Sequence, residues 1–203
     1  MYDKIVIGID QSYKNTGFSV CADGEIKAIT SLDLRECENN TVKRAKVKEK
    51  LTRIILKMWT RTNSMEVIIE RIRLRSEGFL NIDYIKSIGA LNSIIVDVCV
   101  SHNIPCYSVD TRCWKAQIVG TSKPQDNSFG VDPKKWPTIS YIVKLGYERD
   151  ILIRDTRKRK KPLKGWFDRG EEFFYRYNDD AADSACIALY GFQGDREKLQ
   201  AEH

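Results

Sequence analysis

Short runs of apolar residues, separated by polar turn residues, predict three β-strands in the first part of the chain. Residues 4–10, 16–22 and 25–31 are short runs rich in β-favouring residues, and Asp23-Gly24 lies between the last two. Short apolar runs bounded by turn residues are typical of strands, and an Asp-Gly pair between two such runs indicates a tight hairpin. We therefore expect three antiparallel strands at the start of the chain.

The rest of the chain alternates between helical spacing of apolar residues and short buried strands. Residues 41–62 carry apolar side chains at helical intervals and a densely basic opposite face. The last predicted helix, 178–191, can be capped by Asn178 or Asp179 and ended by Gly191. The further predicted helices are 81–102, 111–120 and 136–147, and the further predicted strands are 65–70 and 105–109.

This order of elements predicts an α/β fold with a mixed five-stranded sheet and helices on both faces. The chain has 203 residues and no internal repeat, so we expect 1–203 to form a single domain. Within it, the region 121–177 is expected to be an insertion rich in basic and aromatic residues. Its aromatic residues could stack on bases, but core packing or a dimer contact is the favoured interpretation.

Composition narrows the chemistry. The net charge of +6 suits a partner rich in phosphate. There are only two histidines, so catalysis is expected to depend on carboxylates, lysines or metal-bound water. The six cysteines contain no Cys-x-x-Cys pair and are expected to be reduced thiols. With no signal peptide and no apolar run near the ~18 residues of a membrane span, we expect a soluble, cytoplasmic protein with no membrane partner and no organic cofactor.

Acidic residues stand at three places where a buried element would be expected to stay apolar. Asp10 and Glu70 each end an apolar strand, and Asp180 and Asp183 lie three residues apart on one helix face. Each has an ordinary interpretation: a turn residue, a salt-bridged edge residue, or acids that interact with the helix dipole. If the two strands are neighbours, however, the four acids meet and repel one another unless cations bind there. Mg²⁺ prefers such oxygen ligands.

Three stretches around these acids, GIDQSYKNTGFSV, VIIERI and DDAADSACIALYG, resemble the acidic motifs of RuvC-type Holliday junction resolvases of the RNase H-like superfamily. The stretch GALNSIIVDVCVSHNIPCYSVDTRCWKAQIVG is similar to the central helix, strand and lysine-bearing helix of that family. The resemblance covers about residues 4–120 and 178–191. It is greatest to the phage branch, with a likeness to the poxvirus enzymes in DDAADS, and it implies an RNase H-like fold.

The resemblance implies a metal-dependent endonuclease that resolves four-way DNA junctions as a homodimer, by paired symmetric nicks that leave 5′-phosphate ends. Asp10 would bridge two Mg²⁺ ions, which Mn²⁺ could replace. Glu70 and Asp180 would complete the ligand shells, and Asp183 would hold the second ion. Lys115 occupies the place of a family lysine near the scissile phosphate, and completes the implied catalytic set. If the protein is viral, the cytoplasm in which it acts is that of the host.

Two positions depart from the family pattern. Gln11-Ser12 replaces the usual Pro-Gly, and Arg73 stands where cellular members carry an aromatic wedge, with Phe79 as a candidate substitute. Basic runs are most often solvated faces, but beside an acidic site they predict contacts to DNA phosphates. The predicted DNA-binding residues are Thr16, Arg71, Arg73, Arg75, Phe79, Lys115, Arg157, Lys158, Arg159, Lys160 and Lys161.

Other functions remain open at this point. An RNase H- or transposase-like nuclease would have the same fold and metals, but would act on RNA–DNA hybrids or on a wider range of branched DNA. GIDQSYKNTG also resembles the first phosphate loop of actin-type and sugar-kinase-type ATPases, although the sequence lacks their second Asp-Gly loop. A non-catalytic DNA-binding protein is disfavoured, because it would gain nothing from acids that face phosphate.

Overall fold

The computed structural model describes residues 1–72, 82–121, 123–155, 165–170 and 173–202. Its main feature is a mixed six-stranded sheet in which the strands follow the order β3-β2-β1-β4-β5-β9. The first three strands are antiparallel, β1, β4 and β5 are parallel, and β9 is antiparallel to β5. The strands are β1 (Ile5–Asp10), β2 (Asn15–Ala22), β3 (Glu25–Asp33), β4 (Met65–Glu70), β5 (Cys106–Val109) and β9 (Gln200–Glu202).

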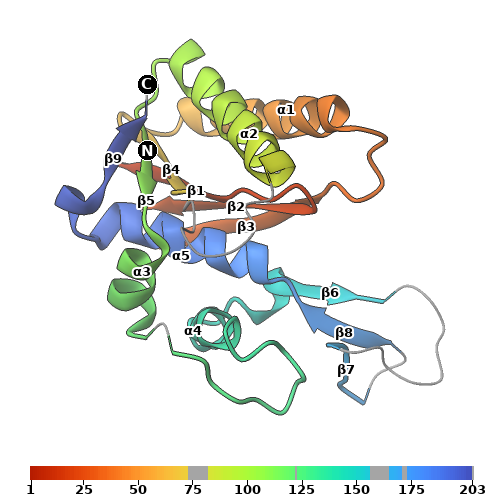
Figure 1. Ribbon diagram of the computed structural model, residues 1–203. Helices are drawn as coiled ribbons and strands as arrows, with labels where there is room; N and C mark the ends of the chain where they lie inside the picture. The colour runs from red at the N-terminus through yellow and green to blue at the C-terminus, as the bar shows by residue number, and fades with distance from the viewer. Residues whose placement is uncertain (73–81, 122, 156–164, 171–172, 203) are drawn as a thin grey trace.

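The predicted α/β architecture is confirmed, including the five predicted strands and helices on both faces of the sheet (Figure 1). The short β9, near the end of the chain, adds a sixth strand at one edge. Three residues give too little periodicity for a strand to be predicted from the sequence, so only pairing with β5 defines it. The helices are α1 (Asn40–Trp59), α2 (Ile82–Ser101), α3 (Thr111–Trp114), α4 (Trp136–Lys144) and α5 (Asp179–Gln193).

Alternating side chains of β1 build two separate cores. Ile5, Ile7 and Ile9 point to the face covered by α1 and α2, whereas Val6 contacts the opposite core with α4 and α5. Successive side chains of a strand point to opposite faces, so a strand buried on both sides is apolar throughout. This explains why the sequence of β1 stays apolar until Asp10.

Helix α2 corrects one expectation. By length and composition it could cross a membrane, although no such segment was expected. Its buried residues include Leu91, Ile95 and Val98, and these belong to the core shared with the sheet and α1. The core helix of a folded domain can meet the same criterion, and packing accounts for the apolar residues on the buried face of α2.

Helix α5 lies unusually close to the sheet. A Cβ atom added to Gly8 would come within 2.3 Å of the Ser184 carbonyl oxygen, and one added to Gly17 within 2.0 Å of the Asp180 carbonyl oxygen. Only glycine therefore permits this approach at the two positions. The buried hydroxyls of Ser19 and Ser184 form a hydrogen bond of 2.7 Å across the interface. The carboxylates of α5 are thus held against β1 and β2.

The region 121–177 contains a second, antiparallel sheet that projects from the main body below α5 (Figure 1). Its order is β6-β8-β7, with β6 (Leu152–Arg154), β7 (Phe167–Asp168) and β8 (Phe174–Tyr177). Phe129, Phe167 and Tyr177 form a cluster with ring centroids 5.0–5.8 Å apart, and Phe167 and Tyr177 are buried. Core packing is therefore the role of these rings. That the whole chain forms one domain stays a prediction.

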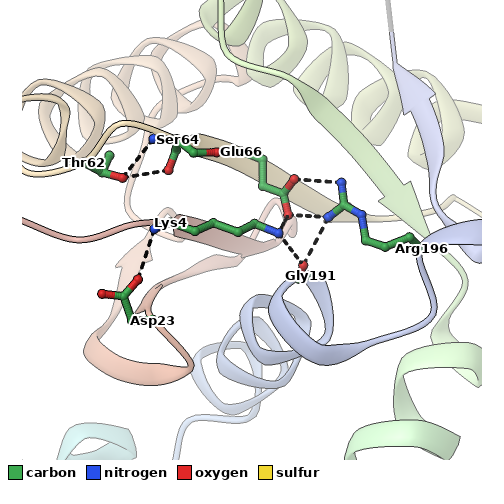
Figure 2. A network of polar contacts seen from close by, with 7 residues as sticks. All are labelled: Lys4, Asp23, Thr62, Ser64, Glu66, Gly191 and Arg196. Atoms are coloured by element: carbon green, nitrogen blue, oxygen red, sulfur yellow. Dashed lines mark hydrogen bonds and ion pairs between the residues drawn. The ribbon is translucent and has the colours of Figure 1, made fainter.

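An ion-pair network around the buried Glu66 joins the main sheet to the end of α5, as Figure 2 shows. Glu66 of β4 is only 6% exposed, and its carboxylate lies 2.9 Å from the Lys4 ammonium and 2.5 Å from the Arg196 guanidinium. Both cations also donate hydrogen bonds of 3.2 Å to the Gly191 carbonyl oxygen. The network thus fixes the carboxyl end of α5 against β1 and β4.

Glu66→Ala is expected to lower the free energy of unfolding by about 2–4 kcal/mol, because it leaves Lys4 and Arg196 without their shared buried partner. The measurement is urea denaturation followed by circular dichroism. Glu49→Ala is the matched control, since Glu49 pairs with Arg53 on the exposed surface of α1 and should cost about 0.5 kcal/mol or less. Equal losses for the two variants would contradict a structural role of the network.

Candidate active site

The parallel pairing of β1 and β4 brings the first two predicted acids together. Ile9 pairs with Ile69, which places Asp10 and Glu70 at adjacent strand ends. The carboxamide of the buried Gln11 then bridges the two strands: it donates to the Glu70 carbonyl oxygen and accepts from the Glu70 amide at 3.2 Å. Gln11 appeared in the sequence only as a departure from a family pattern. In the structure it fixes the position of Glu70 relative to Asp10.

The other two acids reach the same end of the sheet from α5. Asn178 caps this helix by accepting a hydrogen bond from the Ala181 amide. Asn15, at the start of β2, donates to the Asp180 carboxylate at 2.8 Å and to the Asn178 side chain at 2.9 Å. Asn15 therefore orients both the helix cap and the carboxylate that follows it. Neighbouring Asp183 lies one turn further along, with an 18% exposed side chain.

The four acids are close enough to perturb one another. Burial raises the pKa of Asp10 well above its usual value, and the charges of Asp183, Glu70 and Asp180 raise it further, against the opposing charge of Lys115. Burial also raises the pKa of the other three carboxyl groups, that of Asp183 to about 6. Among the described residues, the carboxylate of Asp10 has no hydrogen bond or ion pair. The site thus concentrates negative charge that is only partly compensated.

Glu70 is held from a second side by α3. The Thr111 hydroxyl and the Trp114 indole donate hydrogen bonds of 2.7 Å and 3.2 Å to its two carboxylate oxygens. Both bonds lower the pKa of Glu70 against the larger opposing effect of burial. The sequence analysis missed these two residues. Their separation of three positions on a helix that also carries Lys115 is the signal that could have identified them.

Lys115 supplies positive charge close to Asp10, Glu70 and Asp183. It begins a π-helical segment (Lys115–Val119), and its ammonium lies 4.0 Å from the Asp183 carboxylate and 5.0 Å from the Trp114 ring centroid. Thr138 of α4 is near enough to lower the pKa of Asp183. Its buried hydroxyl nevertheless lacks the geometry of a hydrogen bond, so one polar atom beside Asp183 is unsatisfied.

The chemistry of this donor set suits a hard divalent cation. All four carboxyl groups have raised pKa values; Lys115 acts against this for Asp10, Glu70 and Asp183, and the bases near Asp180 are Lys135, Arg176 and Arg35. Carboxylate oxygens are the ligands that Mg²⁺ and Mn²⁺ prefer. Among the residues that the structure describes, no three His, Cys, Asp or Glu side chains are gathered closely enough to hold a metal ion. Assignment of the four acids as metal ligands therefore stays a prediction, with Asp10 at its centre.

The predicted DNA-binding residues are placed unevenly. Thr16 is fully buried, and its hydroxyl donates to the Ser12 carbonyl oxygen at 2.8 Å, so it has a structural role in place of the expected DNA contact. Arg71 directly follows Glu70 and lies 3.4 Å from the Ser108 hydroxyl, and Lys115 lies at the acidic site. The remaining predictions fall outside the described residues: Arg73, Arg75, Phe79, Arg157, Lys158, Arg159, Lys160 and Lys161.

Solved structures share this arrangement of elements. RuvC of Thermus thermophilus matches with a TM-score of 0.57 at 12% identity, and the same protein in complex with a Holliday junction substrate with 0.56 at 10%. Each match covers 98% of this chain and 99% of the other. The chain has the RuvC fold. The yeast mitochondrial Holliday junction resolvase Ydc2 matches with a TM-score of 0.48 at 18% identity, over 91% of this chain and 75% of the other. No family model and no curated protein matches the sequence.

In the presence of a chelator, Asp183→Asn is expected to raise the free energy of unfolding at pH 7 by about 1–3 kcal/mol. Burial raises the pKa of Asp183 from its usual 3.8 to about 6, so the folded protein retains a proton that the unfolded chain releases. The contribution of this group to stability therefore falls as pH rises from about 4 to about 6, and the gain from Asn vanishes below that range. Urea titrations at pH 4 and pH 7 measure both effects.

The exposed Asp97 of α2 gives the control for this experiment. Asp97→Asn should change the free energy of unfolding by less than about 0.5 kcal/mol at both pH values. A destabilising effect of Asp183→Asn at pH 7, or an equal gain at pH 4, would show that folding does not raise the pKa of Asp183 as described.

Trp114→Phe is expected to raise the pKa of Glu70, because it removes a hydrogen bond that stabilises the ionised carboxylate. The pKa is measured by carboxyl ¹³C NMR during a pH titration of the metal-free protein. Trp59→Phe, at an exposed position on α1, should leave it unchanged. An unaltered Glu70 titration in Trp114→Phe would refute the assigned contact.

Proposed function

We propose that this protein is a divalent-metal-dependent DNA endonuclease that resolves four-way junctions. The observation that carries the proposal is the meeting of Asp10, Glu70, Asp180 and Asp183 at one end of the sheet, with Lys115 beside them. The fold supports it, because one RuvC structure of the same fold is a complex with a Holliday junction substrate. The net charge of +6 favours a polyanionic partner.

Mg²⁺ is the proposed cofactor, with two ions per site and Mn²⁺ as a substitute. Asp10 would contribute to both ions, Glu70 and Asp180 would complete the two ligand sets, and Asp183 would hold the second ion. When bound, such a pair of ions supplies an activated water and stabilises the attacking and leaving oxygens of an in-line displacement. The positive charge of the two ions would neutralise the excess negative charge of the carboxylates.

The protein's own groups have distinct tasks in this proposal. Lys115 would donate to a non-bridging oxygen of the scissile phosphate, since its ammonium already lies 4.0 Å from Asp183. Thr111 and Trp114 act as positioning residues that hold Glu70. Asn15 does the same for Asp180. Fixed ligand geometry of this kind is what second-layer hydrogen bonds provide in metal sites.

The proposal extends to assembly and location. A homodimer related by a two-fold axis would present two such sites to a junction of the same symmetry and would make paired, symmetric nicks. Cleavage of the bond between phosphorus and the 3′ oxygen would leave 5′-phosphate ends. The resemblance to phage and poxvirus resolvases supports action in the cytoplasm, that of the host if the protein is viral. Six free cysteines agree with a reducing compartment.

The test uses four labelled substrates: a four-way DNA junction, a linear duplex, a Y-shaped fork and an RNA–DNA hybrid. Each is incubated with Mg²⁺ or with EDTA, for the wild type, Asp10→Asn and the control Asp97→Asn. We expect paired, Mg²⁺-dependent nicking of the junction, lost by at least about 10³-fold in Asp10→Asn with junction binding retained. Cleavage of the hybrid alone, or no cleavage together with ATP hydrolysis, would overturn the proposal and favour an RNase H-like enzyme or an ATPase.

A further inference from the structure

A basic pocket of about 230 Å³ lies directly beside the acidic site. Its walls come from the β1–β2 turn, the end of β3, β8 and the start of α5. Four basic residues line it: Lys14, Arg35, Lys135 and Arg176. The pocket also includes Asp180, so it shares a wall with the four-carboxylate site. None of the four bases was identified from the sequence as a functional residue.

Two of the four bases already have acidic partners. Arg35 forms an ion pair with Asp33, and Lys135 forms one with Asp179. The exposed Lys14 differs, because its ammonium has neither a hydrogen bond nor an ion pair within the described part of the chain. The pocket therefore retains positive charge that the protein itself does not neutralise.

The surroundings of Arg176 indicate most clearly that the pocket can bind an anion. Its Nε atom is buried and has no hydrogen-bond partner. Its guanidinium lies 5.3 Å from the Trp166 ring centroid, which fixes it without satisfying its donors. Burial lowers its pKa, and the nearby charge of Arg35 lowers it further, while the charges of Asp33 and Asp180 act in the opposite direction. An oxyanion in the pocket would accept from these donors and offset both penalties.

The location of the pocket beside the acidic site favours a phosphate of the DNA backbone as the bound anion. A guanidinium presents a planar fork of donors that matches phosphate oxygens. Each DNA strand carries one phosphate per 3.4 Å of helix axis, so a strand whose scissile phosphate lies at the carboxylates has further phosphates within reach of an adjoining pocket. The uncompensated bases and the shared wall at Asp180 thus fit a second phosphate of the same strand.

We propose that this pocket binds a backbone phosphate of the DNA strand being cut, next to the scissile phosphate, through Arg176 and Lys14. The assignment rests on the proposed nuclease function. It gives the β6-β8-β7 sheet a role in substrate binding, because β8 supplies Arg176. The two residues act by holding the strand, and they leave the chemical step to the carboxylates.

The first experiment measures junction binding in EDTA, in the catalytically inactive Asp10→Asn background. Arg176→Gln and Lys14→Gln should each weaken binding by about tenfold and reduce the slope of log Kd against log salt by about one. Arg61→Gln is the matched control, since Arg61 is exposed and lies before β4, at the opposite end of this strand from Glu70. Thermal unfolding checks that each variant is folded, and Lys14→Gln tests the pocket independently of packing around Arg176.

The second experiment measures junction cleavage by pocket variants that keep Asp10, and it distinguishes failure of the pocket proposal from failure of the nuclease proposal. With Mg²⁺, Arg176→Gln should raise KM by about tenfold with little change in kcat, and Arg176→Lys should recover part of the loss. Junction cleavage by the wild type with unchanged binding and KM in both pocket variants would overturn the pocket and leave the nuclease intact. Absence of cleavage by the wild type would instead overturn the nuclease.

Inorganic phosphate is used to test whether the pocket binds a free phosphate ion instead of a phosphate of the DNA backbone. Calorimetric titration of the wild type with phosphate alone should show no binding below about millimolar concentration, because a single free anion lacks the neighbouring contacts of a DNA strand. Tight binding of phosphate, lost in Arg176→Gln without any change in DNA affinity, would assign the pocket to the free ion and refute the DNA contact.

Discussion

The close approach of α5 to the sheet is the constraint on which the rest of the structure depends. Gly8 and Gly17 leave no room for a side chain between the strands and the backbone of the helix. This approach brings Asp180 and Asp183 to the strand ends that carry Asp10 and Glu70. A helix displaced by one side-chain diameter would keep the same fold but separate the acids. The two glycines therefore determine the chemistry of the site without taking part in it.

The negative charges gathered at the site lower the stability of the fold, and hydrogen bonds offset this repulsion to different extents at the different acids. Glu70 accepts two hydrogen bonds and Asp180 accepts one, but Asp10 accepts none from the described residues. Burial, and after it the repulsion between the acids, raises the pKa values of these carboxyl groups. Elsewhere the acid Glu66 is fully paired, in a network that anchors the far end of α5. The same helix is thus fixed at its carboxyl end by paired charge, while carboxyl groups with raised pKa values gather near its amino end.

The basic pocket and the acidic site are two parts of one electrostatic arrangement. By themselves, the carboxylates of the acidic site would repel DNA. The bases of the pocket would attract it. Placed on the two sides of Asp180, they suit a polyanion that reaches the carboxylates together with its metal ions. The β6-β8-β7 sheet is needed for this, because Arg176 reaches the pocket only when β8 leads directly into α5.

Much of this protein could be predicted from local patterns. The short apolar run of β1 and the helical spacing over 41–62 predicted a buried strand and a covering helix, because burial on both faces or on one face imposes these patterns. The acids at the ends of β1 and β4 and on α5 together indicated a site, since several acids that meet at the edge of a core are costly unless they are paired or bind cations. These features depend on neighbours along the chain, and the sequence by itself determined them.

Contacts between distant segments were decided only by the tertiary structure. Trp114 and Thr111 gained their role from facing Glu70, and Gln11 from the pairing of β1 with β4. Thr16 was expected to contact DNA but is buried, and the short β9 exists only because β5 offers it an edge. The basic pocket joins Lys14 to Arg176 across more than 160 residues. No periodic pattern in the sequence predicts that these two residues lie close together, because their proximity depends on how the main sheet, α5 and the β6-β8-β7 sheet pack in space.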